Sequence, residues 1–370
     1  MEGETQRIAR LTPLTQVLGH IDATVRAVEP RRMATAQAVG RILAEDVINA
    51  AAVPAGPRAL RDGFAVTADA TSDASSYAPV SLTPPLRVDV GDALPAGTDA
   101  VASLDVVVER DGQFALIAPV APGDGVLAAG ADIGAGTTLL RAGSIVRAAD
   151  AAALMAAGIV GVAVRELRIC VVPARPEHDA VVAAVVDLIG SALAAAGGVA
   201  RRGAGGLVLA AFGDQDSDAV IIIGGTGSGH NDTSVRALAT AGRVEVHGVA
   251  LTPGETAAFG MIGQRPVLLV PGRLDAALAV WLTLGRHLLA RLSGRVEDEP
   301  GTKAVLTRKH ASPLGLTEVV PVRAHGGKAE PIAAGYWPLS AILHVNGWIL
   351  VPADSEGYPA GAEVVLRPWP

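Results

Sequence analysis

The segment Ala219-Val-Ile-Ile-Ile-Gly-Gly-Thr-Gly-Ser-Gly-His-Asn-Asp-Thr-Ser234 carries the strongest structural signal in the chain. Its apolar start predicts a buried strand, its glycines predict a tight turn, and Asn231, Asp232 or Thr233 would open a helix. Glycine permits positive φ angles and close backbone approach, and the free N–H groups at a helix start favour an anion. The segment therefore predicts a site for a phosphate or an oxyanion.

Two other interpretations of this segment stay open. One is a purely structural turn in which Asp232 caps the helix. The other is a dinucleotide site, which is weaker because the glycines are spaced Gly-x-Gly-x-Gly and because Glu245 sits near the start of its predicted strand. Within the loop we retain His230 as the one candidate histidine, and the residues around Ser228 do not match the nucleophile elbow of hydrolases.

Strands alternate with helices on both sides of the glycine-rich segment. The predicted strands are 169–172, 207–210, 220–223, 244–249 and 267–270, and the predicted helices are 180–195, 232–241 and 274–292. Continuous apolar strands in such an alternation predict a parallel sheet that is covered on both faces. The Ala/Gly-rich stretch 194–206 is expected to be a loose connection.

The regions before and after this alternation of strands and helices have a different sequence pattern. Helical spacing predicts helices over 14–28, 35–44 and 150–157. Between 51 and 123, Pro/Gly turns separate short apolar runs at 80–82, 88–90, 106–109 and 114–120, and this pattern predicts a small β-domain. Short strands return after Thr302 and predict a C-terminal β-module.

Composition excludes several classes of protein. The chain has 370 residues, 50% of them hydrophobic, and its longest uncharged apolar run, 151–164, is too short to span a bilayer. The acidic N-terminus does not resemble a secretory signal, and the single cysteine, Cys170, excludes a disulfide framework, so we expect a cytoplasmic protein without a membrane partner. A formal charge of −7 disfavours nucleic-acid binding, and the absence of lysine before Lys303 excludes a Walker phosphate loop.

The chain also resembles a known family, and the resemblance extends over nearly its whole length. The glycine-rich segment resembles the Gly-Gly-Thr-Gly motif of molybdopterin-binding domains. Further motifs resemble those of the molybdopterin molybdenumtransferases, the family of the gephyrin E domain: Arg61-Asp-Gly-Phe-Ala, Gly91-Asp-Ala-Leu-Pro-Ala-Gly-Thr-Asp-Ala-Val101, Gly130-Ala-Asp-Ile133, Leu139-Leu-Arg-Ala-Gly143, Thr252-Pro-Gly-Glu-Thr256, Val270-Pro-Gly272 and Val345-Asn-Gly-Trp-Ile-Leu-Val-Pro352. Each motif is weak alone, and together they are specific.

The resemblance implies a multidomain α/β plus β fold and a homodimer. The implied domains are a helical dimerisation region (1–50 with 125–167), an inserted small β-domain (51–124), a three-layer α/β molybdopterin-binding domain with a parallel-type sheet (168–297) and a C-terminal β-barrel (298–370). The implied reaction is insertion of molybdate into adenylylated molybdopterin with release of AMP, assisted by Mg²⁺.

By matched position, the resemblance implies roles for individual residues. The implied catalytic residues are Asp62, Thr98, Glu177 and Asp232, and Asp232 is also the implied metal ligand. A carboxylate beside an anion cradle suits a divalent cation, and the Thr98 hydroxyl suits an oxyanion, although ordinary turn chemistry also explains Asp62 and Thr98. The implied cofactor-binding residues are Gly224, Gly225, Thr226, Gly227, Ser228, Gly229, Pro253, Gly254, Pro271, Gly272 and Arg273.

The chain departs from the family pattern where anions would be contacted. The family's Lys-Pro-Gly-Lys-Pro is Thr252-Pro-Gly-Glu-Thr256 here, so two cations are missing and Glu255 adds a negative charge. We expect Arg175 and Arg273 to replace the lysines if the site is active. Two alternatives therefore stay open: a cofactor carrier that serves a molybdoenzyme client without cleaving the adenylate, and an adenylyltransferase-like activity.

Overall fold

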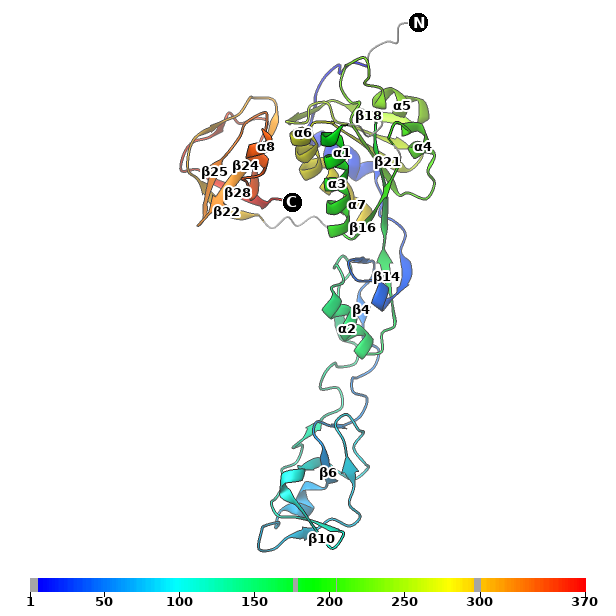
Figure 1. Cartoon of the computed structure of the whole chain (residues 1–370), viewed down its shortest axis with the longest axis vertical. Helices are drawn as coiled ribbons and strands as arrows, with labels where there is room; N and C mark the ends of the chain where they lie inside the picture. Colours follow the sequence, from blue (N-terminus) through cyan, green and yellow to red (C-terminus); the bar gives the residue numbers. More distant parts are fainter. Residues whose placement is uncertain (1–5, 176–178, 204, 296–300) are drawn as a thin grey trace. The chain divides into compact units, whose positions relative to one another are not determined.

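The computed structural model describes residues 6–175, 179–203, 205–295 and 301–370 (Figure 1). The chain divides into two compact units: a larger one of residues 1–45, 143–148 and 161–370, and a smaller one of residues 46–142 and 149–160. No helix in the described part of the chain is long and apolar enough to cross a membrane.

A six-stranded sheet forms the centre of the larger unit. Its strands, in spatial order, are β16 (Gly198–Arg202), β15 (Leu167–Pro173), β17 (Ala219–Ile223), β21 (Arg265–Val270), β20 (Ala258–Ile262) and β18 (Arg243–His247). The first four are parallel, and β20 and β18 add an antiparallel edge. The predicted parallel sheet is therefore confirmed at its centre and is mixed at one edge.

Helices cover both faces of this sheet. The residues of β17 alternate, so that Ile221 packs into one core with α3 (Ala180–Ala195) and Ile222 packs into a second core on the opposite face. The first face is also covered by the continuous helical segment α6 (Leu274–Val280), η4 (Trp281–Gly285) and α7 (Arg286–Ser293), and the second by α4 (Val208–Gly213) and α5 (Ser234–Ala241). The predicted three layers are confirmed, and burial on both faces explains the continuous apolar strands.

Two local predictions in this unit are wrong. The run 207–210 belongs to helix α4, because an apolar run of four residues has no periodicity that separates strand from helix. The stretch 194–206 is not a loose connection, since it contains the edge strand β16. Strand β20 was not predicted.

Five strands of the C-terminal region close into a barrel. They are β24 (Thr317–His325), β25 (Lys328–Pro331), β22 (Thr302–Leu306), β28 (Glu363–Pro368) and β26 (Gly347–Val351), and pairing of β26 with β24 closes the ring. A separate core that includes Val320, Val322 and Ile349 fills it. Three short elements complete this region: β23 (His310–Ala311), α8 (Leu339–Ile342) and β27 (Gly357–Tyr358). The predicted C-terminal β-barrel is confirmed.

The N-terminal segment belongs to the larger unit. Strand β1 (Thr12–Pro13) pairs with β19 (Val249–Thr252), which in turn pairs with β24, and α1 (Leu14–Thr24) packs into the same core as α7. A three-stranded sheet follows, formed by β2 (Arg31–Ala34), β14 (Gly161–Arg165) and β3 (Ile42–Leu43).

The helix predicted over 35–44 is wrong. Only the short 3-10 helix η1 (Thr35–Gln37) forms there, and the chain turns at Gly40, whose φ angle is 78°. The turn places Ile42 and Leu43 in a buried strand beside β14, so their apolar pattern reflects sheet pairing and not a helix.

The smaller unit is built from short strands, as the spacing of turns predicts. Its strands are β4 (Val47–Ile48), β5 (Arg58–Ala59), β6 (Gly63–Val66), β7 (Val80–Ser81), β8 (Arg87–Val88), β9 (Ala100–Ser103), β10 (Val107–Arg110), β11 (Gln113–Leu116), β12 (Val126–Leu127) and β13 (Thr138–Leu140). The 3-10 helices η2 (Ala68–Thr71) and η3 (Leu104–Val106) and most of α2 (Ala148–Ala156) complete it. The helix predicted over 150–157 corresponds to α2 and is confirmed.

Candidate active site

The glycine-rich loop leaves the carboxyl end of β17 in a fixed conformation. Gly224 and Gly225 have φ angles of 90° and 69°, which disfavour any residue with a Cβ atom. The N–H of Gly224 donates to the carbonyl of Val270 at 2.7 Å. The hydroxyl and the N–H of Ser234 donate to the carbonyls of Gly224 and Gly225 at 2.9 and 3.1 Å. The loop is thus tied both to the next strand and to the first turn of α5.

The carboxylate of Asp232 closes the other side of the loop. Its Oδ2 accepts the N–H of Gly229 at 2.8 Å, and a Cβ atom at Gly227 would lie 2.8 Å from the same oxygen. The cap position of α5 is Thr233, whose side chain makes no capping bond. Asp232 as the helix cap is therefore wrong, because this carboxylate holds the loop instead, and the interpretation of the loop as a structural turn stays an alternative.

The middle of the loop offers donors to a ligand. No described residue accepts a hydrogen bond from the N–H groups of Thr226, Gly227 or Ser228. Arg175 adds positive charge, since its Nη2 lies 3.9 Å from Oδ1 of Asp232 and its side chain is 58% exposed. Amide donors and a nearby guanidinium are the groups that bind phosphates and oxyanions.

A cavity of about 880 Å³ lies against this loop. Of the predicted site residues, it is lined by Gly224, Gly225, Thr226, Gly227, Asp232, Gly254, Pro271, Gly272 and Arg273. Arg175, Asp179 and Glu255 also line it, whereas the predicted Ser228, Gly229 and Pro253 do not. The structure thus gathers residues from four separate segments. Three of them follow the parallel strands β15, β17 and β21 at their carboxyl ends, where α/β sheets bind ligands.

Arg273 is the second cation of the cavity wall. Its Nε and Nη2 donate to the two carboxylate oxygens of Asp275 at 3.1 and 2.6 Å, and its guanidinium carbon lies 5.3 Å from the centroid of the Tyr336 ring. The hydrogen bond with Asp275 raises the pKa of Arg273. The two arginines of the cavity are therefore each balanced by a carboxylate, which limits the positive charge that a ligand meets.

The loop has three further contacts that the sequence patterns did not predict. Gln6 is buried, and its Nε2 donates to the carbonyls of Gly225 and Gly227 at 2.8 and 2.7 Å. Thr226 shares a hydrogen bond of 2.9 Å with the hydroxyl of Thr256, and its carbonyl lies 3.0 Å from Nε2 of His247.

These contacts change the choice of histidine. His230 is exposed and does not line the cavity, so our choice of it from the sequence is not supported. Only Thr256 had a signal in the sequence, because it belongs to the Thr252-Pro-Gly-Glu-Thr256 motif.

The remaining predicted residues lie elsewhere. Asp62 and Thr98 belong to the smaller unit, and Glu177 lies outside the described residues. Oδ1 of Asp62 accepts the N–H of Val90 at 2.8 Å, and the Thr98 hydroxyl donates to the carbonyl of Pro95 at 2.7 Å. The Thr98 bond is therefore a local turn contact, whereas the Asp62 bond joins two segments that are 28 residues apart in the chain.

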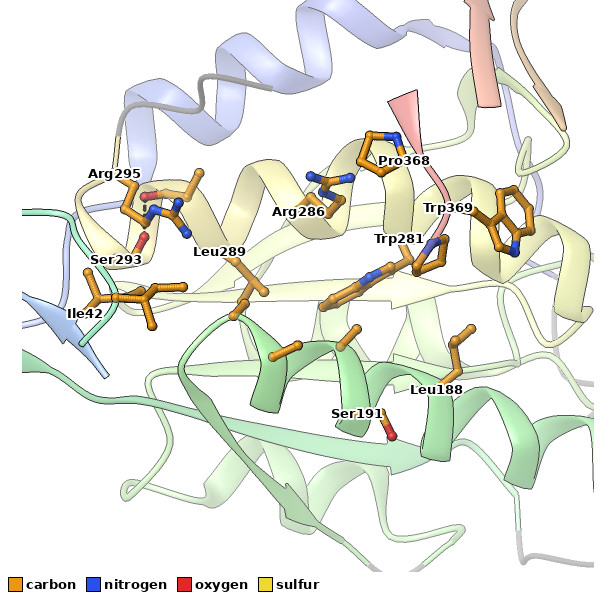
Figure 2. Close-up of a pocket in the computed structure, with 16 residues that line it drawn as sticks. Ile42, Leu188, Ser191, Trp281, Arg286, Leu289, Ser293, Arg295, Pro368 and Trp369 are labelled. Carbon is orange, nitrogen blue, oxygen red and sulfur yellow. Dashed lines mark hydrogen bonds between the residues drawn. The ribbon is translucent and has the colours of Figure 1, made fainter. Parts of the chain in front are cut away.

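A second cavity, of about 570 Å³, contains none of the predicted site residues. Figure 2 shows it between Leu188 and Ser191 of α3 and Trp281 and Leu289 of the α6–η4–α7 segment, with Pro368 and Trp369 from the C-terminus nearby. Its wall is mainly apolar and lacks a glycine loop. The cavity at the glycine-rich loop is therefore the better candidate for anion chemistry.

Comparison with known families agrees with this site. The MoeA N-terminal region (domain I and II) matches residues 10–158, and the MoeA C-terminal region (domain IV) matches residues 303–369. Between them, a "probable molybdopterin binding domain" matches residues 206–291, which include the glycine-rich loop. The chain belongs to the MoeA family. It is thus assigned to molybdenum cofactor biosynthesis, as the resemblance predicted.

Individual relatives are similar over almost their full length. Molybdopterin molybdenumtransferase 2 of Mycobacterium tuberculosis is 27% identical over 395 residues, which cover 93% of this chain and 96% of that protein. Molybdopterin molybdenumtransferase of Haemophilus influenzae is 23% identical over 372 residues, covering 90% and 92%. A crystal structure of the molybdopterin biosynthesis MoeA protein from Pyrococcus horikoshii superimposes with a TM-score of 0.76 at 26% identity, covering 97% of this chain and 99% of that one. The predicted fold class and the assignment to an enzyme family are confirmed.

Proposed function

We propose that this MoeA-family chain binds adenylylated molybdopterin in the glycine-loop cavity, inserts molybdate and releases AMP. The observation that carries the proposal is the convergence of free loop amides, Asp232 and two arginines on one cavity of about 880 Å³. A volume in this range suits a ligand of the size of a nucleotide conjugate. The names of the relatives support a transferase. The adenylylated substrate and the release of AMP are what we propose in addition.

Some residues of the cavity would bind the phosphates, and others would stabilise the negative charge of the reaction. The N–H groups of Thr226 and Gly227 would hold phosphate oxygens without a change in the loop, because Asp232 and Ser234 already fix it. Arg175 and Arg273 would stabilise the negative charge that develops when the bond between the two phosphates breaks. Glu177, which the resemblance places among the catalytic residues, lies outside the described residues and stays a prediction.

Asp232 fits the role of an Mg²⁺ ligand. Magnesium is usually held by one or two carboxylates together with substrate phosphates. Oδ2 of Asp232 is used by the loop, whereas Oδ1 lies 3.9 Å from Arg175, which is too far for a hydrogen bond. No group of three or more acidic, histidine or cysteine side chains gathers as a metal site in the described chain, so ligand phosphates would complete the coordination. Bound there, the cation would neutralise charge on the phosphates.

Release of AMP is the test that separates this proposal from its alternatives. We expect AMP when the native protein is incubated with adenylylated molybdopterin, Mg²⁺ and molybdate, and less when molybdate is omitted. Binding of the adenylate without AMP would support the carrier that serves a molybdoenzyme client. Pyrophosphate release from ATP and molybdopterin would support the adenylyltransferase.

A homodimer is also part of the proposal, because the resemblance implies that two copies contribute to one cleft. Sedimentation of the native protein tests the oligomeric state. Mixing Asp62→Asn protein with Asp232→Asn protein tests the shared cleft, since heterodimers would regain one intact site and therefore part of the AMP release. A monomer, or a mixture that stays inactive, would contradict this part.

A further inference from the structure

Arg273 is exposed but held in place. Its side chain is 62% exposed, yet Asp275 binds one edge of the guanidinium and the Tyr336 ring covers one of its faces. A free surface arginine loses about 2 kcal/mol of rotamer freedom when it is fixed, so an arginine that is already fixed binds an anion at a lower entropic cost. Such restraint is expected of a ligand contact rather than of a solvated surface residue.

The groups that restrain Arg273 are themselves anchored. Asp275 is 2% exposed, and its Oδ2 also accepts the N–H of Trp337 at 3.2 Å. Two residues earlier, the N–H of Gly335 donates to Oε1 of Glu318 at 2.9 Å, and Glu318 is buried in strand β24 of the barrel. The segment 335–337 of the C-terminal region therefore reaches the wall of the glycine-loop cavity.

Arg273 keeps unused donors on the side away from Asp275. The carboxylate takes one N–H from Nε and one from Nη2, and no described residue accepts from Nη1. Arginine has N–H donors in a rigid planar fork that matches tetrahedral oxyanions. Because Arg273 also lines the cavity beside Gly272, the free donors are available to a ligand there.

We propose that Tyr336 is a positioning residue which, together with Asp275, holds Arg273 for contact with a tetrahedral oxyanion in the cavity. The oxyanion is either the phosphate of the nucleotide or molybdate, which share this chemistry. The inference rests on the proposed function for its ligand. It goes beyond that function because it assigns a role to Tyr336, a residue of the C-terminal region that is not among those lining the cavity.

The test is a double-mutant cycle on the full-length protein. AMP and sodium molybdate are titrated separately into the native protein and into Tyr336→Ala, Tyr336→Phe, Arg273→Lys and the Tyr336→Ala/Arg273→Lys double variant. We expect Tyr336→Ala to raise the Kd of one of the two ions about two- to five-fold, the value of an exposed cation–π contact. The Tyr336→Phe variant, which keeps an aromatic ring, should bind the ion with the native Kd. The alanine effect should vanish in the Arg273→Lys background, because an ammonium group cannot form the same planar contact. The ion whose Kd changes identifies the oxyanion.

A change in Kd would not reflect a loss of stability. Tyr336 is 61% exposed, so removal of its side chain should leave the thermal unfolding temperature unchanged. Tyr77→Ala, at a tyrosine that is 98% exposed in the smaller unit, is the matched control. The positioning role is wrong if Tyr336→Ala leaves both Kd values unchanged, if the same loss occurs in the Arg273→Lys background, or if the native protein binds neither ion.

AMP release distinguishes failure of this inference from failure of the proposed function. A native protein that shows the expected cycle and releases no AMP contradicts the proposed function alone. A native protein that releases AMP and shows no effect of Tyr336→Ala contradicts the positioning role alone.

Discussion

The glycine-loop cavity and the smaller β-rich unit hold the candidate residues in different ways. In the cavity, candidate residues from separate segments come together: Arg175, Asp232 and Arg273 line one cavity, and Asp275 accepts the N–H of Trp337, 62 residues further along the chain. In the smaller unit, the Thr98 hydroxyl donates to a carbonyl three residues back, and Asp62 accepts the N–H of Val90, 28 residues further along the chain.

This difference separates two kinds of functional prediction. A group that distant segments hold beside a cavity is pre-organised, so its loss should change ligand chemistry more than folding. A group that is satisfied within its own turn has a structural role already, and any catalytic role needs an independent test.

Asp232→Asn should lower AMP release by about 10²- to 10³-fold, the usual cost of removing one pre-organised electrostatic group. The unfolding free energy should change by less than about 1 kcal/mol, because the amide oxygen of Asn can still accept the N–H of Gly229. Asp187→Asn, at an exposed carboxylate on α3, is the matched control. Retained AMP release with a clear loss of stability would show that the glycine loop is only a structural turn.

Arg273→Ala should affect folding as well as chemistry. The structure pairs Arg273 with the buried Asp275. Loss of the guanidinium should cost about 2–3 kcal/mol in chemical unfolding, below the usual value for a broken buried pair because Arg273 is largely exposed. Adding Asp275→Asn should recover part of this loss, since the unpaired buried charge is then removed. An unchanged stability of Arg273→Ala would mean that the pair contributes nothing.

Thr98→Val tests the smaller unit. If the hydroxyl donates to an oxyanion, AMP release should fall about 10- to 100-fold, the value of one charge-assisted hydrogen bond. Thr67→Val is the control, because the Thr67 hydroxyl also donates to a backbone carbonyl at 2.7 Å, that of Gly97. If the two variants change AMP release equally, Thr98 has only a structural role in its turn.

Regular periodicity explains which parts of the fold could be predicted. Helix α3 begins and ends at the predicted residues, 180 and 195, and strand β17 differs by one residue, because long apolar patterns report burial directly. The short run 207–210 and the segment 35–44 failed, because tertiary pairing decided their conformation. Strand β16 was not predicted, because the sequence around it is rich in alanine and glycine.

The candidate site was predictable only where a local motif exists. The glycine loop, Asp232 and the Pro271-Gly-Arg273 segment were found because each motif is contiguous in the sequence. The contacts of Gln6 with the loop and of Tyr336 with Arg273 join residues far apart in the chain. No spacing rule encodes such contacts, so they become visible only when the chain is folded.

Gln6 provides the smallest and most local test of the pre-organised loop. Its side chain is 7% exposed, and its two hydrogen bonds hold the carbonyls on either side of Thr226. Its Oε1 is buried without a partner among the described residues, which offsets part of the stabilisation from Nε2. The net contribution of Gln6 should therefore be about 1 kcal/mol.

Gln6→Ala should loosen the loop without unfolding the domain. The carbonyl of Gly225 accepts from both Gln6 and the N–H of Ser234, so the Ser234 amide should exchange its hydrogen about five-fold faster, which corresponds to about 1 kcal/mol. Affinity for adenylylated molybdopterin should fall by a similar factor, because part of the binding energy must then order the loop. Gln16→Ala, at an exposed glutamine on α1, should change neither quantity. If the two variants behave alike, the loop is held by Asp232 and Ser234 alone, and the N-terminal segment has no part in shaping the cavity.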